Sequence, residues 1–257
     1  MRTSVACEVQ LQLLGDWLLT TRNDNPDPAR IKLPSGPQHL IALLALHRRC
    51  PRTQAAATLW PDCTDNVASA RLRAVLWRLH HRHSSVPQLL EVDDDSLALA
   101  SNVEVDAQRL RTSAEQLIHS AELTDDMVDH AAPAVLHSAE LLPGWYDDWV
   151  LAARERLQFL RLGALDALAA YRRGQRRNHE ALQAARAATA IEPLHESAHR
   201  VIVQTHLDDG DIVEAVRHYE QYRAMLDREL GLPPSDLFKA LVEPYQVATP
   251  RQFARLR

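Results

Sequence analysis

The chain of 257 residues is poor in the residue types that several kinds of functional site require. Its three cysteines, Cys7, Cys50 and Cys63, are odd in number and show no Cys-x-x-Cys spacing, which predicts free thiols in a reducing cytoplasm. Its seven glycines form no Gly-rich phosphate-binding loop, and no nucleophile-elbow motif is present. The sequence therefore predicts a protein that is not an enzyme and that holds no metal and no cofactor.

Long apolar runs are also missing. None approaches the roughly 18–20 residues that a membrane-spanning helix needs, and the first residues lack the profile of a signal peptide. The apolar fraction of 46% and the charged fraction of 25% are those of a globular protein, long enough for two domains. We therefore expect a cytoplasmic protein with no membrane partner.

Charge is unevenly distributed along this chain, whose formal net charge is −5. Residues 48–82 carry seven arginines against two acidic residues, whereas residues 107–257 carry 18 basic against 22 acidic residues. A local basic region in an acidic protein indicates a face that binds nucleic acid. The alternative is a solvated helix face with i,i+4 ion pairs, but this region offers almost no acidic partners.

The first hundred residues show the pattern of short strands, three helices and a hairpin. Ser35 and Thr53 are the expected caps of the first two helices, and Asp65 or Asn66 is the expected cap of the third. This order predicts a response-regulator-type winged helix-turn-helix, in which the third helix is the recognition helix and the hairpin is the wing. The strands are expected at 9–13, 17–19 and 31–33, the helices at about 37–48, 53–60 and 67–82, and the hairpin strands at 89–92 and 96–99.

The third helix has one apolar face and one basic face. With Leu72 as the inward direction, Val75, Leu76 and Leu79 fall within about 60° of it at 100° per residue. Small residues flanked by arginines occupy the opposite half, which suits a helix that approaches a surface closely. We expect DNA contacts from Ser69, Arg71, Arg73, Trp77, Arg78, His81 and Arg82 of this helix, and from Arg48 and Arg49 before it.

Several of these residues have a second interpretation. For Arg48, Arg49 and Arg52, contact with the DNA backbone and plain solubility fit equally well. Trp77 either packs on the wing or stacks near the sugar-phosphate backbone. The acidic hairpin tip, residues 93–95, is a poor phosphate binder, so a wing contact is expected from its flanks.

The second half of the chain is helical almost throughout. Two helix pairs begin alike, and Ala181 and Ala215 lie 34 residues apart, which is the period of tetratricopeptide repeats. Such stacked pairs form scaffolds for protein contact. His195 and His199 lie at i,i+4 without a third metal ligand, so we expect them at the surface or in hydrogen bonds between helices. Trp145, Tyr146 and Trp149 are expected in an aromatic core seam, with a ligand pocket as the alternative. Helices are expected at about 107–121, 125–139, 147–173, 178–191, 195–208, 211–229 and 235–247.

Several motifs match a known family in the family's own order. LLGDW at 13–17, QHLIALLAL at 38–46, LWPD at 59–62 and LRAVLWRL at 72–79 resemble the DNA-binding half of the Streptomyces antibiotic regulatory protein family. LLPGWYDDWV at 141–150, IEPLHESAHR at 191–200 and ELGLPPS at 229–235 resemble its second half, the bacterial transcriptional activator domain. The resemblance covers residues 8 to 245 and implies a mainly α fold with a small β part. It divides the chain into a winged helix-turn-helix domain at 1–104 and an all-α, tetratricopeptide-repeat-like domain at 105–257.

The resemblance also implies a function. Family members activate transcription by binding direct repeats near the −35 element and recruiting RNA polymerase through its sigma factor, often at antibiotic clusters. It implies a nucleoid-associated protein of the small form without an ATPase, whose partners are double-stranded DNA, the polymerase and, as one option, a second copy on DNA. The turn with Pro61, Asp62, Thr64 and Asp65 is the candidate polymerase contact. His39 departs from the family, which often has arginine there. The alternative function is a protein-interaction scaffold without specific DNA binding.

Overall fold

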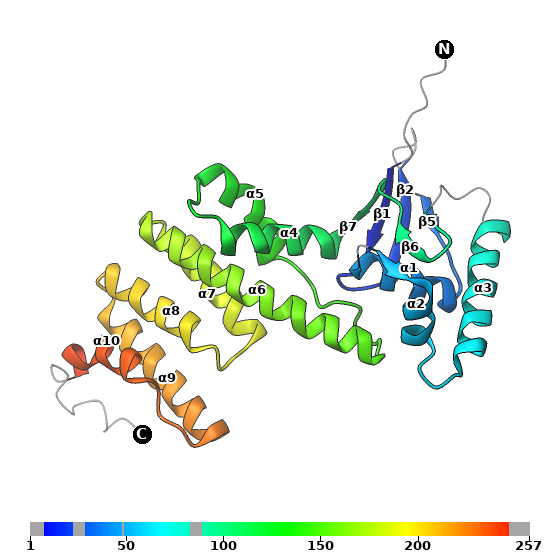
Figure 1. Cartoon of the computed structure of the whole chain (residues 1–257). Coiled ribbons are helices and arrows are strands. Elements are labelled where there is room, and N and C mark those ends of the chain that lie inside the picture. The colour runs from blue at the N-terminus through cyan, green and yellow to red at the C-terminus, as the bar shows by residue number, and fades with distance from the viewer. Residues whose placement is uncertain (1–7, 23–28, 48, 83–88, 247–257) are drawn as a thin grey trace, which may run out of the picture. The chain divides into compact units, whose positions relative to one another are not determined.

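The computed structural model describes residues 8–22, 29–47, 49–82 and 89–246. The chain forms two compact units, and each draws on two stretches of sequence (Figure 1). Residues 1–112 and 138–157 form the N-terminal unit, and residues 113–137 and 158–257 form the C-terminal unit. A small β part near the N-terminus is followed by a long helical part, which confirms the predicted fold class. No described helix is both long and apolar enough to cross a membrane.

The N-terminal unit contains a four-stranded sheet in the order β3-β2-β1-β7. Its strands are β1 (Glu8–Gln12), β2 (Leu18–Arg22), β3 (Ala29–Ile31) and β7 (Val103–Val105). The first three pair antiparallel, whereas β7, which the sequence did not predict, pairs parallel to β1. In this register Leu11 faces Leu19 on one side and Val105 on the other, so one face of the sheet is apolar.

Three helices and a three-stranded sheet complete this unit. The helices are α1 (Ser35–Leu46), α2 (Arg52–Leu59) and α3 (Asp65–Arg82), and the sheet has the order β4-β6-β5 with strands β4 (Cys50–Pro51), β5 (Leu90–Val92) and β6 (Ser96–Leu99). The predicted hairpin is therefore present, and β4 adds a strand to it.

The predicted caps of α1 and α2 are wrong. Pro34 precedes α1 and Pro51 precedes α2, and neither Ser35 nor Thr53 is the cap. A proline has the backbone angle that a helix entrance needs, and its missing N–H is not required there. The helices therefore begin at the first residue after each proline.

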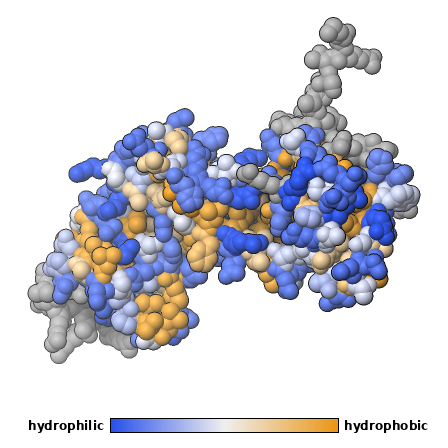
Figure 2. Space-filling model, viewed as in Figure 1, coloured by the Kyte–Doolittle hydropathy of each residue, from blue (hydrophilic) through white to orange (hydrophobic). Residues whose placement is uncertain are grey.

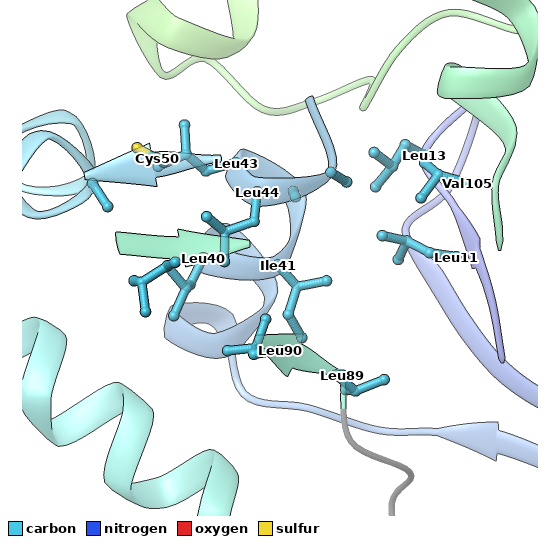
Figure 3. Close-up of a cluster of buried hydrophobic side chains, with 14 of the residues drawn as sticks. Leu11, Leu13, Leu40, Ile41, Leu43, Leu44, Cys50, Leu89, Leu90 and Val105 are labelled. Atoms are coloured by element: carbon cyan, nitrogen blue, oxygen red, sulfur yellow. The ribbon is translucent and has the colours of Figure 1, made fainter. Parts of the chain in front are cut away.

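The core of the N-terminal unit lies between α1 and the two sheets. Leu40, Ile41 and Leu44 of α1 are fully buried, and Leu11 and Leu90 lie in the same cluster (Figure 3). Each such side chain contributes about 1.5–3 kcal/mol of burial free energy. The inward residues of α3 belong to this cluster too, so the core fixes which face of α3 points outward.

The segment 138–157 is part of the same core. Leu141 and Leu142 are buried in it, and the Leu142 N–H donates to the Leu13 carbonyl oxygen at 2.8 Å. Val150, in the first turn of α6 (Asp148–Gly174), is also fully buried there. The start of α6 thus stabilises the unit that carries α3.

In the C-terminal unit, neighbouring helices pack on each other in chain order, namely α7 (Asn178–Ile191), α8 (Glu196–Asp208), α9 (Ile212–Leu230) and α10 (Asp236–Gln246). Ala181, Ala184, Ala185 and Ala188 of α7 are all buried, and such small side chains let helices approach closely. This is the packing expected of the helix-pair repeat. The two helices that precede α6 in the chain are α4 (Asp106–His119) and α5 (Asp125–Leu136).

Arg172 connects three helices of the C-terminal unit. Its guanidinium group, only 3% exposed, forms ion pairs with Asp125 and Asp129 of α5 and with Glu180 of α7. The Nη1 to Asp125 distance is 3.6 Å and the Nε to Glu180 distance is 3.1 Å. Arg177 joins the same carboxylates from the loop after α6, so α5 is held on α6 and α7 by charge as well as by apolar packing.

Candidate nucleic-acid interface

The α3 helix presents one buried and one exposed face, as the sequence predicted. Ala68, Leu72 and Val75 are buried, and Leu76 and Leu79 are half-buried against the core. The surface at the edge where α3 lies is largely hydrophilic (Figures 1 and 2). The exposed residues from Ala70 onward are Ala70, Arg71, Arg73, Ala74, Trp77, Arg78, His80 and His81.

The guanidinium groups of three arginines on this face are unpaired within the described ranges. Within the described ranges, Arg71, Arg73 and Arg78 form no ion pair or hydrogen bond through their side chains. At 100° per residue, Arg71 and Arg78 lie about 20° apart around the axis, whereas Arg73 lies about 160° from Arg71. Arg71 and Arg78 thus flank one side of the exposed face and Arg73 flanks the other. A helix in a groove would direct these side chains to opposite walls.

Trp77 and His81 form a stacked pair on the outer face. Their ring centroids are 4.7 Å apart with an interplanar angle of 19°, and the His81 Nδ1–H donates to the Trp77 carbonyl oxygen at 3.0 Å. Trp77 is 56% exposed, so its ring is open to solvent instead of buried against the hairpin. Because Nδ1 carries the proton, the other nitrogen of the neutral His81 ring is left as a hydrogen-bond acceptor.

The other expected DNA contacts are placed differently. Arg49 forms an ion pair with Asp93 at the hairpin tip, and its Nη1 donates to Ser96 Oγ at 2.9 Å. This guanidinium group lowers the pKa of the Asp93 carboxyl below its usual value. Ser69 is half-buried at the edge of the α3 face. Arg48 and the side chain of Arg82 lie outside the described residues.

The turn between α2 and α3 is exposed. Pro61, Asp62, Thr64 and Asp65 all lie at the surface, whereas Trp60 before them is half-buried against the core. The Ala68 N–H donates to the Thr64 carbonyl oxygen at 2.9 Å, so Thr64 takes the capping position of α3, and the predicted cap at Asp65 or Asn66 is wrong. The turn therefore places two carboxylates, those of Asp62 and Asp65, beside the basic face of the helix.

The aromatic segment before α6 packs on α1. The His39 ring stacks on Trp145 with centroids 4.0 Å apart, and its Nε2 lies 3.5 Å from Asp147 Oδ2. Trp145 and Trp149 are half-buried against the core, but Tyr146 is 78% exposed. The predicted aromatic seam thus holds for two of the three residues. The prediction is wrong for Tyr146, whose side chain lies at the surface.

His199 forms a hydrogen bond between helices in the C-terminal unit, as expected. His199 Nε2–H donates to the Pro193 carbonyl oxygen at 2.9 Å, and its Nδ1 accepts from His218 Nε2–H at 2.9 Å. Burial lowers the pKa of His199, and it lowers the pKa of His218 to about 4. No group of metal-ligating side chains occurs among the described residues.

His195, Asp166 and Ser197 lie together without forming a catalytic triad. His195 Nε2 is 2.9 Å from Asp166 Oδ2 and 2.8 Å from Ser197 Oγ, so a single ring nitrogen contacts both partners. In a catalytic triad the two ring nitrogens serve the acid and the nucleophile separately. Here the Asp166 carboxylate raises the pKa of His195 and fastens α6 to the start of α8.

Comparison with known proteins identifies a family and a similar solved structure. Residues 95–244 match the model of the bacterial transcriptional activator domain. The fold is similar to that of Mycobacterium tuberculosis EmbR, solved in complex with a low affinity phosphopeptide, with a TM-score of 0.71 at 16% sequence identity. The similarity covers 95% of this chain and 66% of that chain, so this chain spans about two thirds of the length of EmbR.

No curated protein matches the sequence significantly. The family match covers more than half of the chain and confirms the resemblance of its second half, and the fold comparison extends over nearly the whole chain. The chain therefore belongs to the bacterial transcriptional activator domain family of transcription regulators.

Proposed function

We propose that this regulator is a sequence-specific DNA-binding activator that places α3 in the major groove of direct repeats near a promoter −35 element. In this proposal residues 1–104 supply a winged helix-turn-helix domain and residues 105–257 supply the activator domain. The activator recruits RNA polymerase, including its sigma factor, at a secondary-metabolite cluster. The DNA contacts are Ser69, Arg71, Arg73, Trp77, Arg78, His81 and Arg82, with Arg48 and Arg49 at the edge.

One observation carries the proposal. Three arginines lie exposed on one helix face and have no acidic partner among the described residues. Surface arginines of this protein elsewhere are commonly paired, as Arg217 is with Glu214 and Arg228 with Glu229. Unpaired guanidinium groups repel each other, and a polyanion removes that repulsion while releasing its counterions.

The polymerase contact is proposed for the exposed α2–α3 turn. Pro61, Asp62 and Thr64 precede α3 and Asp65 is its first residue, and all four are exposed, so we expect the turn to stay accessible while α3 lies in the groove. Its two carboxylates fit a basic surface of the polymerase or its sigma factor. The stacked helix pairs of the C-terminal unit offer a second protein-binding surface.

Footprinting tests this function directly. The full chain is added to DNA from upstream of the operons next to its gene, with and without RNA polymerase holoenzyme. We expect protection of two direct repeats by the protein alone, and joint protection extending over the −35 element when polymerase is added. If the protein protects no direct repeat, either alone or together with the polymerase, DNA binding is refuted. The scaffold function would then be preferred.

A further inference from the structure

Val67 is an exposed apolar residue on the DNA-facing side of α3. It is the third residue of the helix and its side chain is 46% exposed. An exposed valine is unfavourable in a helix on two counts, because β-branched residues have low helix propensity and apolar surface prefers burial. A single exposed apolar residue is common on protein surfaces, so its position among its neighbours decides its meaning.

Its neighbours form a row of alternating chemistry along the axis. Residues at i, i+4, i+7 and i+11 lie on one side of a helix, and here they are Val67, Arg71, Ala74 and Arg78. All four are exposed, and neither arginine has a partner among the described side chains. The row thus offers two guanidinium groups that can bind guanine or phosphate, with methyl groups beside each of them.

We propose that Val67 is a specificity-determining residue that reads the 5-methyl group of a thymine in the operator. The inference rests on the proposed DNA binding. In helix-turn-helix complexes the first residues of the recognition helix contact the base edges, and Val67 lies in the first turn. In the major groove, only thymine among the four bases presents a methyl group, and apolar side chains select it by contact.

The neighbouring side chains support such an approach. Ala70 and Ala74 on the same face are small, so the backbone can come near the base edges and a short side chain such as valine can reach them. Arg71 lies one turn further, about 6 Å along the axis. The thymine is therefore expected within about two base pairs of the position that Arg71 contacts.

Replacing thymine by deoxyuridine removes only this methyl group and tests the assignment. The full chain is titrated, by fluorescence anisotropy, onto the footprinted operator with each thymine replaced in turn. We expect one thymine in each repeat whose replacement lowers affinity about fourfold, the effect of one buried methyl group. With Val67→Ala, the thymine and uridine duplexes should bind within about twofold of each other.

Val213→Ala is the matched control, because Val213 is 66% exposed on α9 and far along the chain from α3. This variant should keep the full response to uridine, and alanine should preserve the helix in both variants. A specific footprint without any sensitive thymine, or an equal fourfold response in Val67→Ala, would overturn this assignment alone. Absence of any specific footprint would overturn the proposed DNA binding and this assignment with it.

Discussion

Arg49 binds Asp93 and thereby joins the turn after α1 to the tip of the β5–β6 hairpin. The same guanidinium group donates to Ser96 Oγ at 2.9 Å, so it spans both ends of the hairpin turn. The Arg52 N–H donates to the Asp95 carbonyl oxygen at 2.9 Å and fixes the turn from its other side. The acidic hairpin tip is thus held in place by Arg49, which precedes α2, and by Arg52, the first residue of α2.

This pairing predicts that Arg49 contributes less to DNA affinity than the arginines of α3. Arg49→Ala should lower affinity about twofold, whereas Arg71→Ala should lower it about fivefold or more, since a lost arginine contact costs about 1–3 kcal/mol, or roughly 5- to 150-fold. Anisotropy titrations at one salt concentration compare the two variants. An equal loss in both would show that Arg49 leaves Asp93 to contact DNA.

The His199–His218 pair predicts acid sensitivity of the C-terminal unit. The pKa of His218 is about 4 in the folded chain because burial disfavours the charged ring, against an ordinary value of 6.5. The unfolded chain therefore binds more protons between these values, so the free energy of unfolding falls as pH decreases from 6.5 towards 4. We expect a loss on the order of 1–2 kcal/mol at pH 4.5, after allowance for the partial exposure of His218.

Thermal unfolding followed by helical circular dichroism between pH 4.5 and 7 measures this loss. His218→Gln removes the titrating ring and should flatten the pH dependence, whereas His130→Gln, at an exposed position, should leave it unchanged. His195 acts in the opposite direction, because its raised pKa adds stability at low pH that is lost as pH rises above 6.5. An identical pH dependence in the wild type and His218→Gln would contradict the role of the pair.

The ion pairs of Arg172 predict a large loss of stability of the C-terminal unit when this residue is replaced. Arg172→Ala would leave Asp125, Asp129 and Glu180 with Arg177 as their remaining shared cation. Breaking a fully buried ion pair costs about 3–5 kcal/mol, but these carboxylates are partly exposed, so we expect about 2–3 kcal/mol. Urea unfolding of the variant measures it, with Arg200→Ala of α8 as the control. A loss under about 0.5 kcal/mol, the ordinary range for surface changes, would show that solvent replaces the network.

The sequence predicted the helices well because each carries an amphipathic period over many residues. The inward face of α3 was assigned from Leu72 and its neighbours alone, and the helices from α4 to α10 lie where the periodicity placed them. The strands β4 and β7 were missed, because strands of two or three residues have no measurable period and their partners lie far away in the chain. The parallel pairing of β7 with β1 joins residues more than ninety positions apart, such as Val9 and Val103.

Some parts of the candidate site can likewise be predicted from the sequence, and other parts depend on the fold. The basic face of α3 follows from residue types on one helix, so the sequence could identify it. The pairing of Arg49 with Asp93 spans 44 positions, and only the fold determines it. Val67 carries no charge, so the pattern of basic residues that indicates DNA contact does not include it, although its i,i+4 spacing to Arg71 is visible in the sequence.

The most direct test of the account is the salt dependence of operator binding by the variant with both Arg71→Ala and Arg73→Ala. Two lost arginine contacts cost about 2–6 kcal/mol, so this variant should lose specific affinity about thirtyfold or more. Log affinity falls with log salt concentration by about 0.9 per neutralised phosphate, so the slope should flatten by up to about two. The variant with Arg156→Ala and Arg228→Ala, which removes two exposed charges elsewhere, should bind like the wild type. Unchanged affinity and slope in the Arg71 and Arg73 variant would contradict the assignment of α3 as the DNA-binding helix.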